Sequence, residues 1–122
     1  MSNPRLLIVE DQEDIRELIR LTLDLEGYEV DEAANGDEGL RKVSSFQPQL
    51  VLLDVMMPGS LDGFAVCRQI KGSGAHRRTK VVMLTARCQA SDREAGRQAG
   101  ADAYLTKPFS PKQLLEVVHK LL

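Results

Sequence analysis

Short runs of apolar residues alternate along the chain with segments in which apolar residues recur every three or four positions. Three of these runs are unbroken apolar tetrads, at residues 6–9, 50–53 and 81–84, and weaker strand signals lie at residues 29–33 and 103–105. Continuous apolar strands are typical of a parallel sheet that is covered on both faces. The pattern therefore predicts five short strands, the strongest of them buried on both sides.

Helical periodicity fills the intervals between these strands and the stretch after the last one. The predicted helices cover residues 13–25, 36–46, 63–71, 90–99 and 111–121. In the first helix the expected inward stripe consists of Ile15, Leu18, Ile19, Thr22 and Leu25. The fourth helix has few large apolar residues and should pack lightly, and Ser110 is the expected N-cap of the fifth. Strict alternation of strand and helix predicts a (βα)5 fold with helices on both faces of a parallel sheet.

Composition limits the class of protein without identifying a function. The 122 residues are 43% hydrophobic and 28% charged, with a formal net charge of −2, so we expect one domain over residues 1–122 with no direct nucleic-acid binding. No apolar run approaches the roughly 7–15 residues of a secretory signal or the roughly 18 of a membrane span, so we expect a cytoplasmic protein with no membrane contact. Cys67 and Cys88 lack metal-ligand spacing and are expected to be reduced thiols.

Polar side chains that could bind a ligand or take part in a reaction follow four of the five predicted strands. Glu10 and Asp11 come after the first strand, Asp54 after the third, Thr85 after the fourth and Lys107 after the fifth. Ligands of open parallel sheets bind outside the carboxyl ends of the strands. We therefore expect these five side chains to converge on one edge of the sheet.

The charges in this group favour metal-assisted phosphoryl chemistry. Carboxylates about 5 Å apart repel each other by roughly 3 kcal/mol per pair, and one lysine cannot neutralise three of them. A hard divalent cation such as Mg²⁺ can, with Glu10 and Asp11 as ligands. Asp54 is then the predicted nucleophile toward phosphorus, while Lys107 and the Thr85 hydroxyl stabilise the oxygens of the transferring phosphoryl group.

Four ordered motifs carry a family resemblance that extends over essentially the whole chain. They are IVED at residues 8–11, VLLDVMMPG at 51–59, LTA at 84–86 and GADAYLTKPF at 100–109. Together they resemble the receiver domain of two-component response regulators, the family of the chemotaxis receivers. The resemblance implies a doubly wound, flavodoxin-like sheet of strand order 2-1-3-4-5.

The same resemblance implies that Asp54 is phosphorylated by a sensor histidine kinase, a phosphotransfer protein or a small phosphodonor. Mg²⁺ would be held by Asp11, Asp54 and the backbone carbonyl of Met56, with Glu10 acting through water. The domain would lose its phosphoryl group slowly and would not be a turnover enzyme.

A switch to a distant surface is also implied by the resemblance. The backbone N–H of Ala86 would join Thr85 and Lys107 at the phosphoryl group, and the Lys107–Pro108 peptide bond would be cis. Thr85 and Tyr104 would form the switch. The signal would reach the face formed by the fourth helix, the fifth strand and the fifth helix, where a downstream effector or a second copy of the chain would bind.

Departures from the common family pattern bear on the lifetime of the phosphoryl group. Position 12 is Gln where many relatives carry a third acid, and the loop at residues 59–63 is one residue longer than usual; neither should abolish the chemistry. Met56 and Arg87 occupy positions that tune hydrolysis in this family, and neither has an obvious group for orienting an attacking water. The hypothesis is a long-lived phosphoryl group.

Two other functions stay open at this point. A phosphohydrolase of the haloacid dehalogenase type also uses a strand-end aspartate, but it needs a second carboxylate two residues later, where this chain has Met56. A phosphorylation-independent interaction scaffold of receiver shape is the other alternative. Against the scaffold stands the intact set of Glu10, Asp11, Asp54, Thr85 and Lys107.

Overall fold

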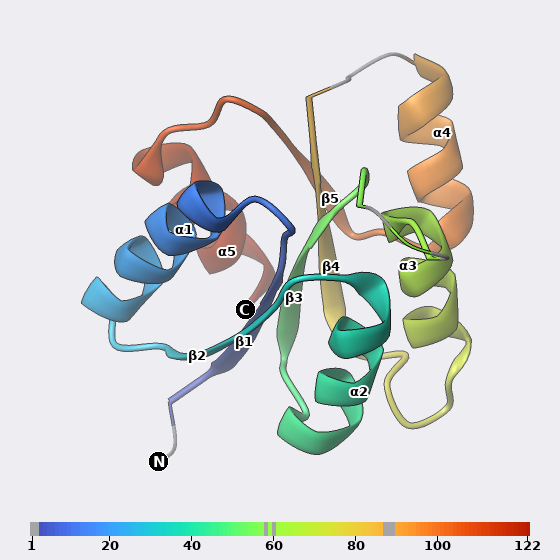
Figure 1. Ribbon diagram of the computed structural model, residues 1–122, viewed down its shortest axis with the longest axis horizontal. Coiled ribbons are helices and arrows are strands. Elements are labelled where there is room, and N and C mark those ends of the chain that lie inside the picture. The colour runs from blue at the N-terminus through green and yellow to red at the C-terminus, as the bar shows by residue number, and fades with distance from the viewer. Residues whose placement is uncertain (1–2, 58, 60, 87–89) are drawn as a thin grey trace.

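The computed structural model describes residues 3–57, 59, 61–86 and 90–122, and within them five strands alternate with five helices (Figure 1). The strands are β1 (Arg5–Val9), β2 (Glu29–Ala33), β3 (Leu50–Asp54), β4 (Lys80–Thr85) and β5 (Ala103–Thr106). The helices are α1 (Glu13–Leu25), α2 (Gly36–Phe46), α3 (Gly63–Gly72), α4 (Ala90–Ala99) and α5 (Pro111–Leu121). All strand pairs are parallel and the order is β2-β1-β3-β4-β5, so the predicted fold and strand order are confirmed.

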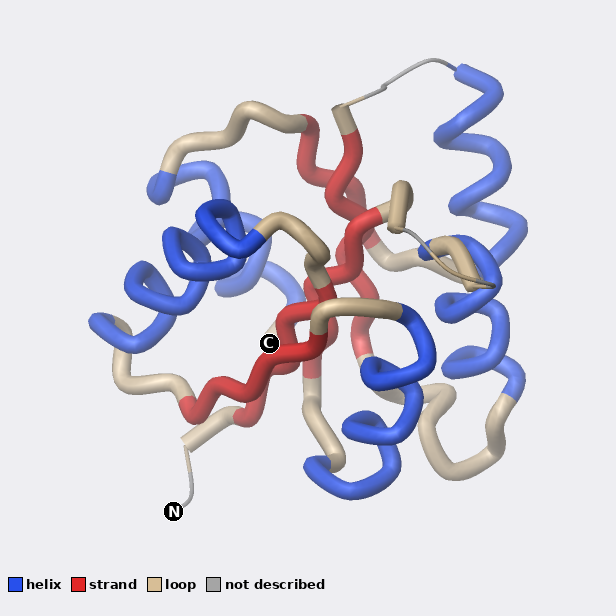
Figure 2. Tube along the Cα trace, in the orientation of Figure 1, coloured by secondary structure: helices blue, strands red, loops and turns tan. Residues whose placement is uncertain are grey.

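The sheet forms a middle layer between two groups of helices. Helices α1 and α5 lie on one face, and α2, α3 and α4 lie on the other (Figure 2). Successive side chains of a strand point to opposite faces, so Leu6 and Ile8 belong to one core while Leu7 and Val9 belong to the other. Burial on both faces explains why the central strands are continuously apolar.

Polar side chains cap three of the helices at their first turns. The Asn35 side chain accepts the backbone N–H of Glu38 at 2.9 Å at the start of α2, and Asp62 accepts that of Ala65 at 2.8 Å at the start of α3. Ser110 and Gln113 form a reciprocal capping box at the start of α5, which confirms Ser110 as the N-cap. These caps satisfy helix N–H groups that have no partner within the helix.

Part of the inward stripe expected for α1 is wrong. Leu18 is 45% exposed and Leu25 is 87% exposed, whereas Leu23, outside the expected stripe, is fully buried. The buried arc of the helix is centred between Ile19 and Leu23, so Leu18 and Leu25 fall beyond its edge. Periodicity located the helix but missed its rotation about its own axis.

Light packing of α4 agrees with its sequence. Among the described side chains of this helix, only the small residues Gly96 and Ala99 are buried. Helix α4 rests mainly against α3, where the Cys67 thiol donates to the carbonyl of Ala99 at 3.4 Å. Burial raises the pKa of Cys67 to about 11, so this free thiol is unreactive. Cys88 lies outside the described residues.

The loop between α4 and β5 is tied to the end of α3. The Lys71 ammonium lies 2.7 Å from the Asp102 carboxylate, which also accepts the backbone N–H of Val81 at 2.8 Å. Asp102 therefore joins α3, β4 and the start of β5. None of the helices in the described residues has an apolar stretch long enough to span a bilayer.

Candidate functional site

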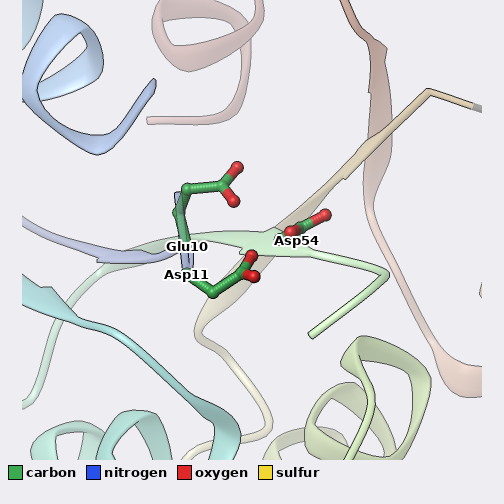
Figure 3. A group of neighbouring side chains, drawn as sticks. All are labelled: Glu10, Asp11 and Asp54. Carbon is green, nitrogen blue, oxygen red and sulfur yellow. The ribbon is translucent and has the colours of Figure 1, made fainter. Parts of the chain in front are cut away.

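Strand register places the acidic residues side by side. In the pairing of β1 with β3, Val9 lies opposite Leu53, so Glu10 and Asp11 come directly after one strand and Asp54 ends its neighbour. One carboxylate oxygen from each of the three residues lies within 4.8 Å of the others. Figure 3 shows the three side chains extending into the same region beyond the ends of β1 and β3. Strand order changes direction between β1 and β3, which is where ligands of such sheets bind.

Two of the three carboxyl groups are buried, and a lysine reaches them. Glu10 is 0% exposed and Asp54 is 4% exposed. The Lys107 ammonium lies 2.7 Å from Glu10 Oε1 and 3.4 Å from Asp54 Oδ1. The buried Glu10 Oε1 is therefore paired with the Lys107 ammonium.

The Asp54 carboxyl group is also held by the backbone. The backbone N–H of Met56 donates to Asp54 Oδ1 at 3.2 Å, and that of Gln12 donates to Glu10 Oε2 at 3.3 Å. The side chain of Met56 is 60% exposed and brings no charged group to the site. The two buried acids therefore have fixed orientations before any ligand arrives.

Crowding of like charge changes the titration of this group. Burial, followed by hydrogen bonding and charge repulsion from Glu10, raises the pKa of Asp54 to about 7, with Lys107 opposing the shift. Burial acts to lower the pKa of Lys107, but its contacts with Glu10 and then Asp54 outweigh burial and raise it. Three carboxyl groups and one ammonium leave an excess of negative charge when all are ionised. A divalent cation with oxygen ligands fits that donor set.

Thr85 ends the neighbouring strand β4 at the same edge of the sheet, and Ala86 follows it. Strand β4 lies between β3 and β5, and Asp54 pairs with Leu84, so Thr85 comes one residue beyond that pair and is 3% exposed. The backbone N–H of Lys107 donates to the Thr85 carbonyl at 2.7 Å. The Lys107–Pro108 bond is cis, as the family resemblance implies. Arg87, expected to influence hydrolysis, lies outside the described residues.

Tyr104 belongs to a separate region on α4 and β5. Its partly buried ring packs against the core on the α3 and α4 side, and its hydroxyl donates to the backbone carbonyl of Arg93 at 3.3 Å. A Cβ atom built on Gly96 would lie 1.4 Å from the Tyr104 hydroxyl oxygen. The Tyr104 hydroxyl thus occupies the slot in α4 beside Gly96, in the space that the Cβ of any other residue at this position would fill.

Two contacts at the acidic cluster have no counterpart in the sequence predictions. Arg16 Nη1 donates to the carbonyl oxygen of Glu10 at 2.8 Å. At Gly63, a Cβ would lie 2.3 Å from the carbonyl oxygen of Asp54. The available signals were an arginine among the acidic residues of α1 and a glycine at the first position of α3, and neither points to this site by itself.

Comparison with known proteins identifies the family. The sequence model of the response regulator receiver domain matches residues 6–119. The chain is 45% identical over 118 residues to the transcriptional regulatory protein ResD of Bacillus subtilis (strain 168), covering 97% of this chain and 48% of that protein. It is equally 45% identical over 118 residues to the response regulator MprA of Mycobacterium tuberculosis (strain ATCC 25618 / H37Rv), covering 97% of this chain and 50% of that protein. The chain spans about half the length of these relatives.

Solved structures agree with this family. The chemotaxis protein CheY4 of Vibrio cholerae superposes with a TM-score of 0.94 at 31% identity, covering 99% of this chain and 100% of that one. The receiver domain of the sensor histidine kinase PA1611 of Pseudomonas aeruginosa PAO1, with a magnesium ion coordinated in its active site cleft, gives a TM-score of 0.89 at 31% identity and covers 98% of both chains. With the sheet order and the family match together, the chain belongs to the receiver domains of two-component response regulators, which act as phosphoacceptor switches and not as turnover enzymes.

Proposed function

We propose that this chain, as one receiver domain over residues 1–122, accepts a phosphoryl group on Asp54 from the phosphohistidine of a sensor histidine kinase or phosphotransfer protein. The observation that carries the proposal is the convergence of Asp54 with Glu10, Asp11 and Lys107 at the switch point of the sheet. The domain then signals to a downstream effector through the α4–β5–α5 face, which we also propose as the surface for any dimer. We place it in the cytoplasm, without direct contact to nucleic acid or membrane.

Mg²⁺ is the proposed cofactor because the donor set suits it. Asp11, Asp54 and the backbone carbonyl of Met56 would hold the ion, and Glu10 would act through a bound water. The close carboxylate oxygens of Glu10, Asp11 and Asp54 support this assignment. When bound, the ion would neutralise the carboxylates and polarise the oxygens of the incoming phosphoryl group.

Each remaining site residue has a proposed task in the transfer. The ionised Asp54 carboxylate attacks phosphorus as the phosphorus–nitrogen bond of the donor breaks, and the histidine nitrogen keeps the electron pair of that bond. Lys107 is already within ion-pair distance of Asp54 and supplies positive charge to the phosphoryl oxygens. The Thr85 hydroxyl and the backbone N–H of Ala86 complete the cradle. Movement of Thr85 toward the phosphoryl group, coupled to rotation of the Tyr104 ring, is the proposed switch.

A shallow apolar cavity beside Lys107 supports access by a protein phosphodonor. Its volume is about 370 Å³, and its lining residues are Gln12, Ile15, Leu18, Ala86, Lys107, Pro108 and Phe109. Leu21 and Leu25, which are 64% and 87% exposed, extend the apolar surface along α1. A donor that covers this surface places its phosphohistidine at the edge of the acidic site.

Phosphorylation in vitro tests the proposal. The purified chain is incubated with Mg²⁺ and acetyl phosphate, and its intact mass is measured for wild type and Asp54→Asn. Asp62→Asn is the matched control, because Asn can still cap α3 and the residue lies outside the acidic cluster. We expect one phosphoryl group per chain in wild type and in the control, and none in Asp54→Asn.

Two results would favour other functions. Absence of any adduct in wild type, at saturating Mg²⁺, would support the interaction scaffold. Release of free phosphate over many turnovers from small phosphoesters would support a hydrolase. Decay of the adduct after removal of acetyl phosphate tests the proposed long lifetime, since loss within seconds in the presence of Mg²⁺ contradicts it.

A further inference from the structure

We propose that Arg16 is a positioning residue for the cation site, acting through the backbone of Glu10. This inference rests on the proposed function of the acidic cluster. The Arg16 side chain is 19% exposed, and its two nitrogen contacts go to different elements. Nη1 donates to the carbonyl oxygen of Glu10 at 2.8 Å, and Nε donates to Glu32 Oε1 on β2 at 3.0 Å.

The contact with Glu10 falls where the chain leaves the sheet. Strand β1 ends at Val9, and the backbone N–H of Glu10 still donates to the carbonyl of Ala33 on β2 at 3.0 Å. The Glu10 carbonyl comes after the last strand pairing, and Arg16 supplies its donor. The backbone is therefore fixed on both sides of Glu10 just before Asp11, which sets the Cα–Cβ directions from which both carboxylates extend.

Glu32 holds the guanidinium in the geometry that this contact requires. In the β1–β2 register Glu32 lies opposite Ile8, two residues before Glu10. A planar guanidinium can donate from Nε to one acceptor and from Nη1 to another, whereas a lysine ammonium offers a single centre. The carboxylate of Glu32 also balances the charge of Arg16. We therefore expect Arg16 to affect the cation site chiefly through geometry and only weakly through charge.

Arg20 provides a matched comparison for separating geometry from charge. It forms an ion pair with the other oxygen of Glu32, and it lies 3.6 Å from the carboxylate of Asp24. Among the described residues it makes no hydrogen bond or ion pair with Glu10. Arg16→Gln and Arg20→Gln each remove one guanidinium from Glu32, but only the first removes the donor to the Glu10 carbonyl.

The experiment measures Mg²⁺ binding to the unphosphorylated protein by calorimetry and by NMR titration. We expect Arg16→Gln to weaken Mg²⁺ affinity by about 10-fold, the range typical for residues that orient metal ligands. Arg20→Gln should change it by less than about 2-fold, because exposed charges act weakly through water. Arg16→Lys should restore part of the loss. In the metal-free protein, the Glu10 carbonyl carbon and Asp11 amide resonances should move in Arg16→Gln and stay in place in Arg20→Gln.

Acetyl phosphate labelling gives a second readout. Arg16→Gln should need a higher Mg²⁺ concentration for half-maximal labelling but reach the wild-type extent at saturation. Equal Mg²⁺ affinities of Arg16→Gln and Arg20→Gln, with normal binding by wild type, would overturn this inference and leave the proposed function standing. If Arg16→Gln does not fold, wild-type Mg²⁺ affinity in Arg16→Met, whose side chain has no donor for the Glu10 carbonyl, overturns the inference in the same way. Absence of Mg²⁺ binding by wild type would overturn the proposed function and this inference together.

Discussion

The acidic site and the α4–β5 region are built in opposite ways. The acidic site follows strands whose side chains are almost completely buried, and its Glu10 and Asp54 are 0% and 4% exposed. In α4, the buried residues among the described side chains are Gly96 and Ala99, neither of which is large. The site therefore moves only if the central sheet moves, whereas α4 can shift with little loss of apolar contact.

A rigid reacting site combined with a lightly packed helix is the arrangement that a molecular switch requires. A reacting group gains from fixed geometry, since small displacements of a carboxylate weaken both cation binding and attack on phosphorus. An output surface must instead adopt two arrangements that differ by a few kcal/mol. Large buried side chains such as Ile19 and Leu23 in α1 would each contribute roughly 1.5–3 kcal/mol to holding a helix in place. Within its described residues, α4 has no buried side chain of that size.

The largest expected effect tests the rigidity of the acidic site through Gly63. An added Cβ at this position would lie 2.3 Å from the Asp54 carbonyl oxygen and 2.7 Å from Val55 Cα, both of them backbone atoms that cannot rotate away. Gly63→Ala should therefore lower the free energy of unfolding by about 3 kcal/mol and weaken Mg²⁺ binding. Urea denaturation and Mg²⁺ titration measure the two effects.

Gly72→Ala is the control for this change. Gly72 ends α3, and a Cβ there meets no atom within 4 Å. Its substitution should leave both measurements near the wild-type values. A Gly63→Ala protein with unaltered stability and Mg²⁺ affinity would show that the end of β3 and the start of α3 can shift at little cost. The acidic site would then be no more rigid than α4.

A second, smaller effect concerns the ionisation of the buried Asp54 carboxyl group. The pKa of Asp54 is about 7 in the folded protein because of burial and then Glu10, against an ordinary value of 3.8. The unfolded chain therefore releases this proton at lower pH than the folded one, so the stability contributed by the protonated form falls between about pH 4 and pH 7. Without divalent cations, Asp54→Asn should be more stable than wild type above pH 7 by on the order of 2 kcal/mol, and the advantage should vanish near pH 4.

Chemical denaturation in EDTA between pH 4 and pH 8 measures this difference. Comparing the two proteins at each pH cancels the titration of groups that they share. Added Mg²⁺ should stabilise wild type above pH 7 much more than it stabilises Asp54→Asn. A stability difference that does not vary with pH would mean that Asp54 has an ordinary pKa, and the shift ascribed to burial and then to Glu10 would be wrong.

Sequence patterns were sufficient for the five parallel strands and for the residues at their carboxyl edge, whereas the strand order came from the family resemblance. The apolar tetrads located three buried strands, and the polar residues after four of the five strands could be assigned to one edge because parallel strands share a direction. The convergence of Glu10, Asp54 and Lys107 follows from that rule and the strand order. The chemical roles of these residues are still proposals.

Sequence patterns did not predict the contacts that depend on how a helix is rotated about its axis and positioned on the sheet. The inward stripe of α1 was displaced, because the arc that faces the sheet is decided by packing against β2 and α5. The hydrogen bond from Arg16 to the Glu10 carbonyl joins a helix to a loop, and no periodic pattern encodes it. Gly63 and Gly96 have no Cβ and so leave room for atoms of β3 and β5, respectively. Nothing in the sequence near either glycine identifies those atoms.

The smallest expected effect lies on the α4–β5 side, at Gly96. An alanine there would place its Cβ 1.4 Å from the Tyr104 hydroxyl oxygen, so the ring must leave the slot and lose its hydrogen bond to the Arg93 carbonyl. Alanine also favours the helix by up to about 1 kcal/mol, which offsets part of that cost. We expect Gly96→Ala to lower the free energy of unfolding by only about 1 kcal/mol, less than Gly63→Ala, because α4 or the ring can move.

The chain has no tryptophan and two tyrosines, so Tyr104 can be observed alone after Tyr28→Phe. In that background, Gly96→Ala should change the fluorescence and quenching of Tyr104, while Gly72→Ala should leave both unchanged. Mg²⁺ affinity should stay at the wild-type value in both variants, because neither substitution touches the acidic cluster. If Gly96→Ala instead destabilised the domain as strongly as Gly63→Ala, α4 would be as firmly held as the central strands, and light packing could not underlie the output role proposed for this surface.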